Sequence, residues 1–435
     1  MKLWKQLVGL FFLLVIFDGA LRKWVLPSQE LILFVVKDVV LWGGYLAYAT
    51  RRNAFELPRP LRTTWVPTLL GAYVAIVLLQ AVNIRQPALT VSALGLKSHL
   101  AYVPLVVLLP PLVARATTRQ MERLLWGYAL CIQLPIVALG IFQFYQPPSA
   151  WINKYVAESA TVSAMEGFPR ITGTFSYIGS FTPYLQFAAF LSTSVLLAGL
   201  RWNREPLKRL GWILLAGTAI ILPMTGSRSV VFIAIGGLIA LFFVMKNRSH
   251  LLRIVGAVLG VVGILLFSFG EIPFFKGWEL VAERTESAGT ERVVARSSGP
   301  FTAPIIGITE AGLFGYGVGT NHQAAGQVTS VSDWPGRIGG DRPGVRVIME
   351  LGILGWLVLV ALKLALVFVA LQALRRSQAP IELIISATAF CILLSSLITP
   401  VVYYAVGSAL HWGSAGAVLG VWSLQQVRIN TNEVK

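Results

Sequence analysis

Residues 346–371 read RVIMELGILGWLVLVALKLALVFVAL, an apolar run with only three ionisable side chains, Arg346, Glu350 and Lys363. A transmembrane helix needs about 20 predominantly apolar residues, so this run is long enough to cross a bilayer. Comparable runs recur along the chain near 3–20, 31–49, 65–82, 98–114, 123–145, 178–200, 208–224, 229–245, 251–270, 381–399 and 407–424. We therefore expect an all-α integral membrane protein with about twelve transmembrane helices.

The composition agrees with a membrane protein. Of 435 residues, 56% are hydrophobic and 13% are charged, which is more apolar surface than one soluble core can bury. A single polytopic domain over residues 1–435, with residues 271–345 inserted as a loop subdomain, is the simplest organisation. Lys2 and Lys5 precede an apolar run and resemble a signal peptide, but no small-residue cleavage site follows, which favours an uncleaved first helix.

Basic residues outnumber acidic ones, 36 to 19, for a net charge of +17. In a soluble protein this excess indicates nucleic acid. Here the basic residues lie in short segments at alternate helix ends, as the positive-inside rule predicts, so no nucleic acid partner is expected. The segments assigned to the cytoplasm are Arg51–Arg62, Arg115–Arg123, Arg201–Arg209, Lys246–Arg253 and Arg375–Arg376.

This orientation places both termini in the cytoplasm and leaves three notable regions on the outer side of the membrane. They are residues 146–177, the tight turn Thr225–Arg228 and the loop 271–345 between the ninth and tenth spans. The loop is too long to be a mere connection, and its patterning predicts short helices. Cys131 and Cys391 both lie in apolar runs, so neither a disulfide framework nor a cysteine metal cluster is expected.

Four short motifs occur in order along the chain. They are Phe168–Phe175 (FPRITGTF), Thr225–Ser229 (TGSRS), Gly315–Gly319 (GYGVG) and Glu350–Gly355 (ELGILG). Each is weak alone, but the ordered set and the layout of spans resemble the superfamily of O-antigen ligases and Wzy-type polysaccharide polymerases. The glycine phrase lacks the strand and helix of a dinucleotide fingerprint, so we interpret it as a turn that lets the backbone approach another segment.

The resemblance implies a metal-independent, inverting glycosyltransferase without a cofactor. Its donor is a glycan on undecaprenyl diphosphate, its acceptor is a sugar hydroxyl on the periplasmic face, and a chain-length regulator and a flippase are partners to expect beside the lipid bilayer. We expect a polymerase of oligosaccharide repeat units that makes exopolysaccharide or O-antigen. A ligase that transfers the glycan to lipid A–core stays open, and so does a lipid-linked glycan flippase or transporter.

The resemblance also implies site residues. A family Lys and two family Arg fall on Lys97, Arg228 and Arg296, which we expect to bind and neutralise the leaving diphosphate. Further substrate contacts are expected from Arg170, Arg292, Arg342, Arg346 and Glu350. No metal ligands are expected.

The general base stays open between Asp341 and His322, with Glu310 and Glu350 as further options. The family His that opens the re-entering helix falls in register on Asp341, and no His stands there. Asp341 can accept the proton of the acceptor hydroxyl. His322 is the other candidate, because it is the only His that our topology places in a periplasmic loop.

Ordinary explanations stand beside these assignments. Lys97 fits a snorkelling anchor at a span end, and Asp341 fits a helix cap. Arg292 and Arg296 alternate with glutamates, as in a helix with surface ion pairs. Lys37 is expected to find a partner on another helix. The segment Asp18–Trp24 (DGALRKW) is distinctive, with Arg22 and Lys23 as an interfacial anchor or a headgroup contact, and no mechanism accounts for it.

Overall fold

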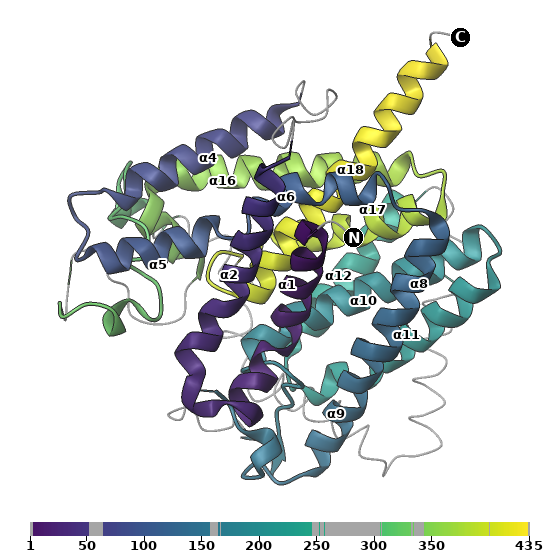
Figure 1. Cartoon of the computed structure of the whole chain (residues 1–435), viewed down its shortest axis with the longest axis horizontal. Coiled ribbons are helices and arrows are strands. Elements are labelled where there is room, and N and C mark those ends of the chain that lie inside the picture. The colour runs from purple at the N-terminus through teal and green to yellow at the C-terminus, as the bar shows by residue number, and fades with distance from the viewer. Residues whose placement is uncertain are drawn as a thin grey trace. The chain divides into compact units, whose positions relative to one another are not determined.

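The computed structural model of the chain describes residues 3–51, 64–156, 164–165, 167–245, 252, 256, 305, 307–331, 334, 343–399 and 401–433. The protein is mostly helical (Figure 1). Seven helices in these ranges are long and apolar enough to cross a membrane: Leu3–Val25, Ile32–Ala49, Leu89–Val113, Thr118–Tyr145, Ile178–Arg201, Glu205–Met224 and Val345–Arg375. This confirms a multi-pass helical membrane protein, while the count of twelve spans and the orientation stay predictions.

The chain divides into two compact units. The first comprises residues 1–54, 112–287 and 371–392, and the second comprises residues 55–111, 288–370 and 393–435. The helices of the first unit are α1 (Leu3–Ala20), the π-helical turn η1 (Leu21–Val25), η2 (Pro27–Gln29), α2 (Glu30–Ala49), α8 (Thr118–Tyr128), η3 (Ala129–Gln133), α9 (Leu134–Tyr145), η4 (Trp151–Asn153), α10 (Ile178–Arg201), α11 (Glu205–Met224) and α12 (Arg228–Val244). Most of α17 (Pro380–Ser395) belongs to it too.

Close helix packing organises the first unit. Helix α10 packs against α11 and α12, and α1 packs against α2 (Figure 1). A Cβ at Gly211 would lie 2.6 Å from the Cα of Leu196, so the absent side chain lets α11 approach α10. Strands β1 (Ala164–Met165) and β2 (Phe168–Pro169) form a short antiparallel hairpin with Ala164 opposite Pro169.

An ion-pair cluster joins α1 to α2. The Lys37 ammonium lies 3.1 Å from Asp18 Oδ2, and the Arg22 guanidinium lies 3.5 Å from the same oxygen and 3.2 Å from Glu30. The partner expected for Lys37 on another helix is thereby confirmed. Pairing is what makes charged groups tolerable in a span, and here it fixes the register of the first two helices.

The second unit contains α4 (Trp65–Ala81), α5 (Leu89–Leu100), α6 (Leu105–Leu108), η5 (Ala325–Gln327), most of α16 (Pro343–Arg375) and α18 (Ala405–Glu433). The short helix α7 (Pro110–Val113) lies across the boundary of the two units. Helix α4 packs against α5, and α18 packs against α6. The helix expected to begin near residue 98 begins at Leu89 instead, because Thr90, Ser92 and Lys97 lower the hydropathy there without breaking the helix.

Helix α16 is broken at Gly352, whose φ of 71° and ψ of 179° are not helical. This region of conformational space is essentially restricted to glycine. The break frees backbone groups that lipid cannot satisfy, and the glycine-rich segment 312–317 pairs with them. Tyr316 N–H donates to Met349 O at 2.7 Å, Gly317 N–H to Glu350 O at 3.1 Å, and Ile353 N–H to Gly312 O at 3.1 Å.

Glycines permit this docking. A Cβ at Gly315 would lie 2.5 Å from Gly352 N, and one at Gly319 would lie 2.1 Å from Val91 O on α5. Such distances are far below van der Waals contact. The interpretation of the GYGVG phrase as a close backbone approach is confirmed.

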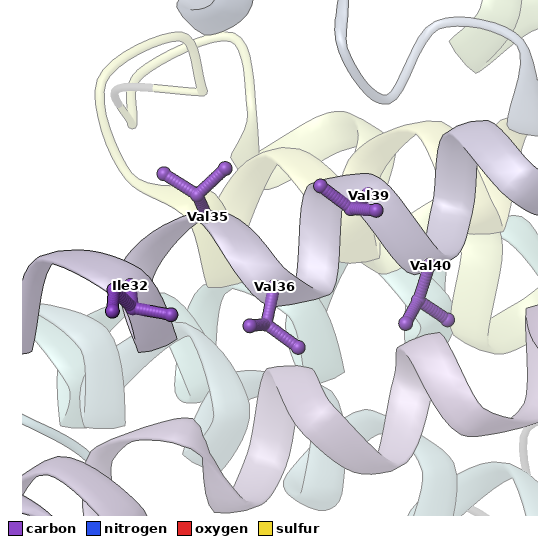
Figure 2. Close-up of a pocket in the computed structure, with 5 residues that line it drawn as sticks. All are labelled: Ile32, Val35, Val36, Val39 and Val40. Atoms are coloured by element: carbon purple, nitrogen blue, oxygen red, sulfur yellow. The ribbon is translucent and has the colours of Figure 1, made fainter. Parts of the chain in front are cut away.

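An apolar groove runs along α2 and is lined by Ile32, Val35, Val36, Val39 and Val40 (Figure 2). Several of these side chains are exposed, for example Val39 at 62%. The lining offers no hydrogen-bonding or titratable group, so the groove suits lipid chains and has no chemistry of its own.

Most of the predicted span 251–270 and most of the loop 271–345 lie outside the described residues, including the stretches 274–282 and 283–296 where helices are predicted. The other spans are matched by helices. The expected spans 31–49 and 178–200, for example, correspond to α2 (Glu30–Ala49) and α10 (Ile178–Arg201).

Replacing Gly352 with alanine is expected to destabilise the protein. The backbone strain alone costs about 1–3 kcal/mol, and the new Cβ would lie 2.2 Å from Leu313 O. The apparent unfolding temperature in detergent measures the loss.

Two glycines are matched controls. Gly312 also has a positive φ, 62°, but open space around its Cβ, so Gly312→Ala measures strain without the clash. Gly71 in α4 is helical and open, and alanine there should be neutral or stabilising. If Gly352→Ala were as stable as Gly71→Ala, the break would not be a built feature of the fold.

Candidate functional site

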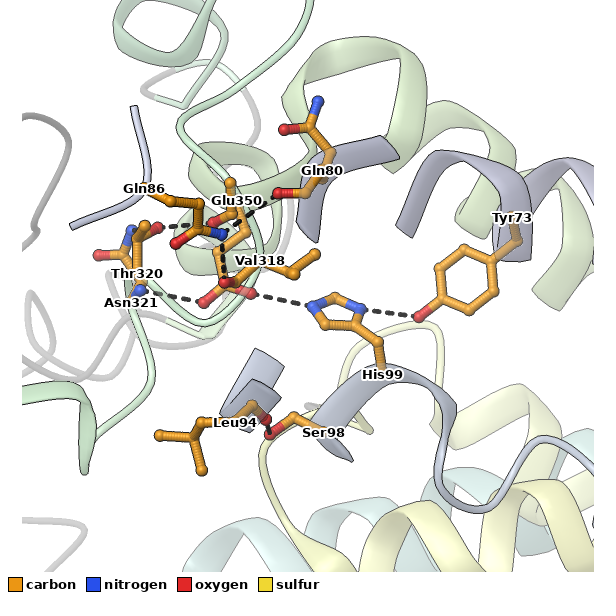
Figure 3. A network of polar contacts seen from close by, with 11 residues as sticks. Tyr73, Gln80, Gln86, Leu94, Ser98, His99, Val318, Thr320, Asn321 and Glu350 are labelled. Carbon is orange, nitrogen blue, oxygen red and sulfur yellow. Dashed lines mark hydrogen bonds and ion pairs between the residues drawn. The ribbon is translucent and has the colours of Figure 1, made fainter. Parts of the chain in front are cut away.

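A buried carboxylate, that of Glu350 on α16, lies at the centre of the polar network in the second unit (Figure 3). The side chain of Glu350 is fully buried. Its Oε2 lies 2.9 Å from His99 Nε2, and its Oε1 accepts from the backbone N–H of Asn321 at 3.0 Å. Both oxygens are therefore satisfied, which a buried carboxylate requires.

His99 connects Glu350 to a tyrosine on a third helix. The Tyr73 hydroxyl lies 2.8 Å from His99 Nδ1, and both side chains are buried. With Glu350 ionised, Nε2–H of a neutral imidazole donates to the carboxylate, and Nδ1 accepts from the phenol. This assignment satisfies every polar atom of the Tyr73–His99–Glu350 triad.

Local structure explains how these side chains meet. Glu350 lies two residues before the break at Gly352, and His99 lies in the last turn of α5. A Cβ at Gly95 would lie 2.3 Å from the carbonyl carbon of Val318, so α5 contacts the loop directly. Gln86 Nε2 donates to Val318 O at 2.7 Å and holds the same loop from the chain segment before α5.

Further ionisable side chains belong to the same region of the second unit. Arg346, one turn before Glu350 on α16, is buried, and its guanidinium lies 5.9 Å from the centre of the Tyr403 ring. The ring of His322 lies 6.2 Å from that of Tyr403. The charges of Glu350, Lys97 and Arg346 all act on His322. The candidates Lys97, His322, Arg346 and Glu350 thus gather in one cluster, which we call the Glu350 cluster.

His322 and Tyr403 both carry shifted pKa values. Burial lowers the pKa of His322 to about 4, the Glu350 charge opposes this shift, and the positive charges of Lys97 and Arg346 add to it. Burial, and then the nearby charge of Glu350, raise the pKa of Tyr403 well above its ordinary value. At neutral pH, His322 is therefore uncharged and Tyr403 retains its proton.

The neutral His322 has a defined tautomer. Its Nδ1 accepts from the backbone N–H of Ala324 at 3.1 Å. The proton of the neutral ring must then lie on Nε2, which makes this nitrogen a hydrogen-bond donor. To act as a general base, His322 would have to lose the Ala324 contact.

The remaining described candidates, Arg170 and Arg228, lie together in the first unit. Arg170 Nε donates to the carbonyl oxygen of Thr225 at 3.0 Å. Thr225 begins the turn that leads to Arg228, the first residue of α12, and Gly226 in that turn has a φ of 59°. The hydroxyl of Thr225 accepts from Ser227 N–H at 3.1 Å and closes the turn.

The predicted site residues thus form two groups, and four of them lie outside the described residues: Asp341, Arg342, Arg292 and Arg296. Tyr73, His99, Asn321 and Tyr403 were not among the predictions. His99 could have been found, because an ionisable side chain within an apolar run usually marks a functional or paired position. In the part of the chain that the structure describes, no group of three His, Cys, Asp or Glu residues could hold a metal ion.

No family model matches the sequence, and no curated protein matches it. The resemblance to O-antigen ligases and Wzy-type polymerases therefore depends on the four ordered motifs. The activity that it implies is a proposal, developed below.

The shifted pKa of His322 predicts a pH dependence of stability. The unfolded chain binds a proton at His322 below about pH 6.5, whereas the folded chain binds it only near pH 4. Stability should therefore fall as the pH is lowered from about 6.5 to about 4, and His322 should contribute nothing to the slope above that window. Apparent unfolding temperatures in detergent over this range measure the effect.

The variant His322→Asn isolates the contribution of this residue, because the asparagine oxygen can still accept from Ala324 N–H. We expect a flatter pH dependence between about pH 6.5 and 4 in the variant. Identical slopes in the two proteins would show that His322 titrates normally.

Proposed function

We propose that the chain is a membrane glycosyltransferase that polymerises oligosaccharide repeat units carried on undecaprenyl diphosphate, on the periplasmic face of a bacterial inner membrane. The observation that carries the proposal is the Glu350 cluster, in which the charges of Lys97, Arg346 and the buried Glu350 all act on His322. A diphosphate presents oxygen acceptors and negative charge, which lysine, arginine and a neutral histidine N–H can bind together. The order of the sequence motifs supports the same class of substrate.

The proposed reaction is an inverting displacement. The oxygen of the acceptor hydroxyl bonds to the anomeric carbon of the donor sugar, and the bond from that carbon to the diphosphate oxygen breaks. The diphosphate leaves with the bonding electrons, and the hydroxyl proton passes to a base. Lys97 and Arg346 stabilise the negative charge that develops on the leaving group.

His322 and Asp341 divide the proton chemistry in this proposal. Because Nδ1 of His322 accepts from Ala324 N–H, we assign His322 the role of a donor through Nε2. Asp341 is then the general base, two residues before the first residue of α16. In this proposal Tyr73 and His99 hold the Glu350 carboxylate in position as a hydrogen-bond acceptor. Neither Tyr73 nor His99 contacts substrate.

The first unit carries a cation set of its own. Arg228 is half-buried at the start of α12, and Arg170 holds the preceding turn. A helix N-terminus and an arginine both favour anions, so this set also suits phosphate oxygens.

Alanine at Arg228 or at Arg346 is expected to abolish polymer formation. Removal of one charge-stabilising donor lowers a rate by about a hundredfold or more, so polymer should be undetectable while the protein still accumulates in the membrane. The measurement is the length distribution of glycans in a deletion strain that carries each variant, with protein levels determined by immunoblot.

Lys154→Ala is the matched control, because Lys154 is an exposed cation of the same predicted periplasmic face. It should leave the polymer unchanged. Normal polymer in both arginine variants would refute the proposal. In the deletion strain itself, single unpolymerised repeat units indicate a polymerase, whereas long lipid-linked chains that are not transferred indicate a ligase.

A further inference from the structure

The π-helical turn η1, which ends α1, carries a buried lysine. Lys23 lies in the middle of this turn and is 6% exposed. Turns of the π type are rare and occur frequently at functional sites. They add a residue to the helix and so change the direction of the side chains that follow.

The ammonium group of Lys23 binds neutral acceptors of a distant segment. Its Nζ donates to Thr172 Oγ1 at 3.1 Å and to the carbonyl oxygen of Gly173 at 2.8 Å. A lysine within a membrane span is costly and is usually retained for a function. The function of Lys23 is therefore to be sought in the segment 168–175 that it binds.

The same segment is held from two other sides. Gln143 Oε1 accepts from the backbone N–H groups of Thr172 at 3.3 Å and Gly173 at 2.8 Å. The hydroxyl of Thr174 donates to Ile16 O on α1 at 2.7 Å. The backbone at 172–174 is thus held by three groups, and Lys23 is the only one of them with an ionisable side chain.

Arg170 lies two residues before this held backbone and connects it to the turn before α12. Arg170 Nε donates to Thr225 O at 3.0 Å, and Arg228 begins α12 three residues later. A continuous series of contacts thus runs from Lys23 through Thr172 and Arg170 to the turn that presents Arg228.

We propose that Lys23 is a positioning residue that sets the places of Arg170 and Arg228, and so prepares the first unit's cation set for an anionic substrate. The anion-binding part of this inference rests on the proposed function, whereas the positioning part does not. It gives the Asp18–Trp24 segment a role, because the turn η1 places the buried Lys23 amine against the segment that positions the two arginines.

Lys37 provides a matched control. It is also a buried lysine of the first unit, 2% exposed, but it binds Asp18 and the carbonyl oxygen of Phe34. Lys37→Met therefore measures the general effect of removing a buried ammonium from the α1–α2 pair. Lys23→Met removes the contact with Thr172 and Gly173 as well.

The first arm of the test measures the position of the turn before α12 and needs no enzymatic activity. In the full-length protein with Cys131 and Cys391 replaced by alanine, Ser227→Cys places a thiol in the turn, where Ser227 is buried. Loss of a hydrogen bond from a charged donor predicts about a tenfold rise in the rate of labelling by a membrane-permeant maleimide. We expect this rise in Lys23→Met, wild-type rates in Lys37→Met, and recovery in Lys23→Arg.

Thr172→Val is the second variant and serves if Lys23→Met does not accumulate. Thr172 is buried, and valine keeps its shape while removing the oxygen that Lys23 binds. The reference is the Ser227→Cys protein that retains Lys23 and Thr172. Labelling rates equal to this reference in both Lys23→Met and Thr172→Val would overturn the inference.

The second arm measures coupling through polymer formation per molecule of protein. If Lys23 acts through Arg170, the double variant Lys23→Met, Arg170→Met should be no less active than Arg170→Met alone, whereas Lys37→Met should combine independently with Arg170→Met. Independent effects of Lys23 and Arg170 would overturn the inference. Absence of polymer from the unsubstituted protein would refute the proposed function alone, since the labelling arm still reports on positioning.

Discussion

The second unit depends on one constraint, which is that every backbone group of a broken helix must find a partner where water is scarce. Gly352 breaks α16, and the segment 312–317 supplies donors and acceptors on both sides of the break. The same docking brings Asn321 N–H to Glu350. The docked segment therefore both satisfies the freed backbone groups and helps to place the Glu350 carboxylate.

Burial determines how charged groups are paired in two places, the Glu350 cluster and the ion pairs around Asp18. In the second unit, the buried Glu350 contacts His99 and the Asn321 N–H, and its charge acts with those of Lys97 and Arg346 on the neutral His322. In the first unit, Asp18 is shared by Lys37 and Arg22, whereas Lys23 binds neutral oxygens.

The sequence was sufficient for the helices and for part of the site. Apolar run length predicts helices well, because the bilayer imposes it, and the ends of α2 and α10 fall within a residue of expectation. The start of α5 was misplaced because helix formation there does not require hydrophobicity. Lys97, His322, Arg346 and Glu350 were predicted as site residues, and their roles stay predictions. Tyr73, His99 and Tyr403 were not predicted, since a single sequence does not show which side chains from distant parts of the chain meet.

The broken helix α16 is synthesised after several of the residues that it contacts. Tyr73, His99 and the segment 312–317 all precede α16 in the chain, so each is made before the residue that completes it. Until α16 enters, the Tyr73–His99 pair lacks its carboxylate and the glycine-rich segment lacks its backbone partners. Proteins emerge from the ribosome N-terminus first, so Glu350 is added after both of these partners have been made, and only Tyr403 of the residues described around it follows later in the chain.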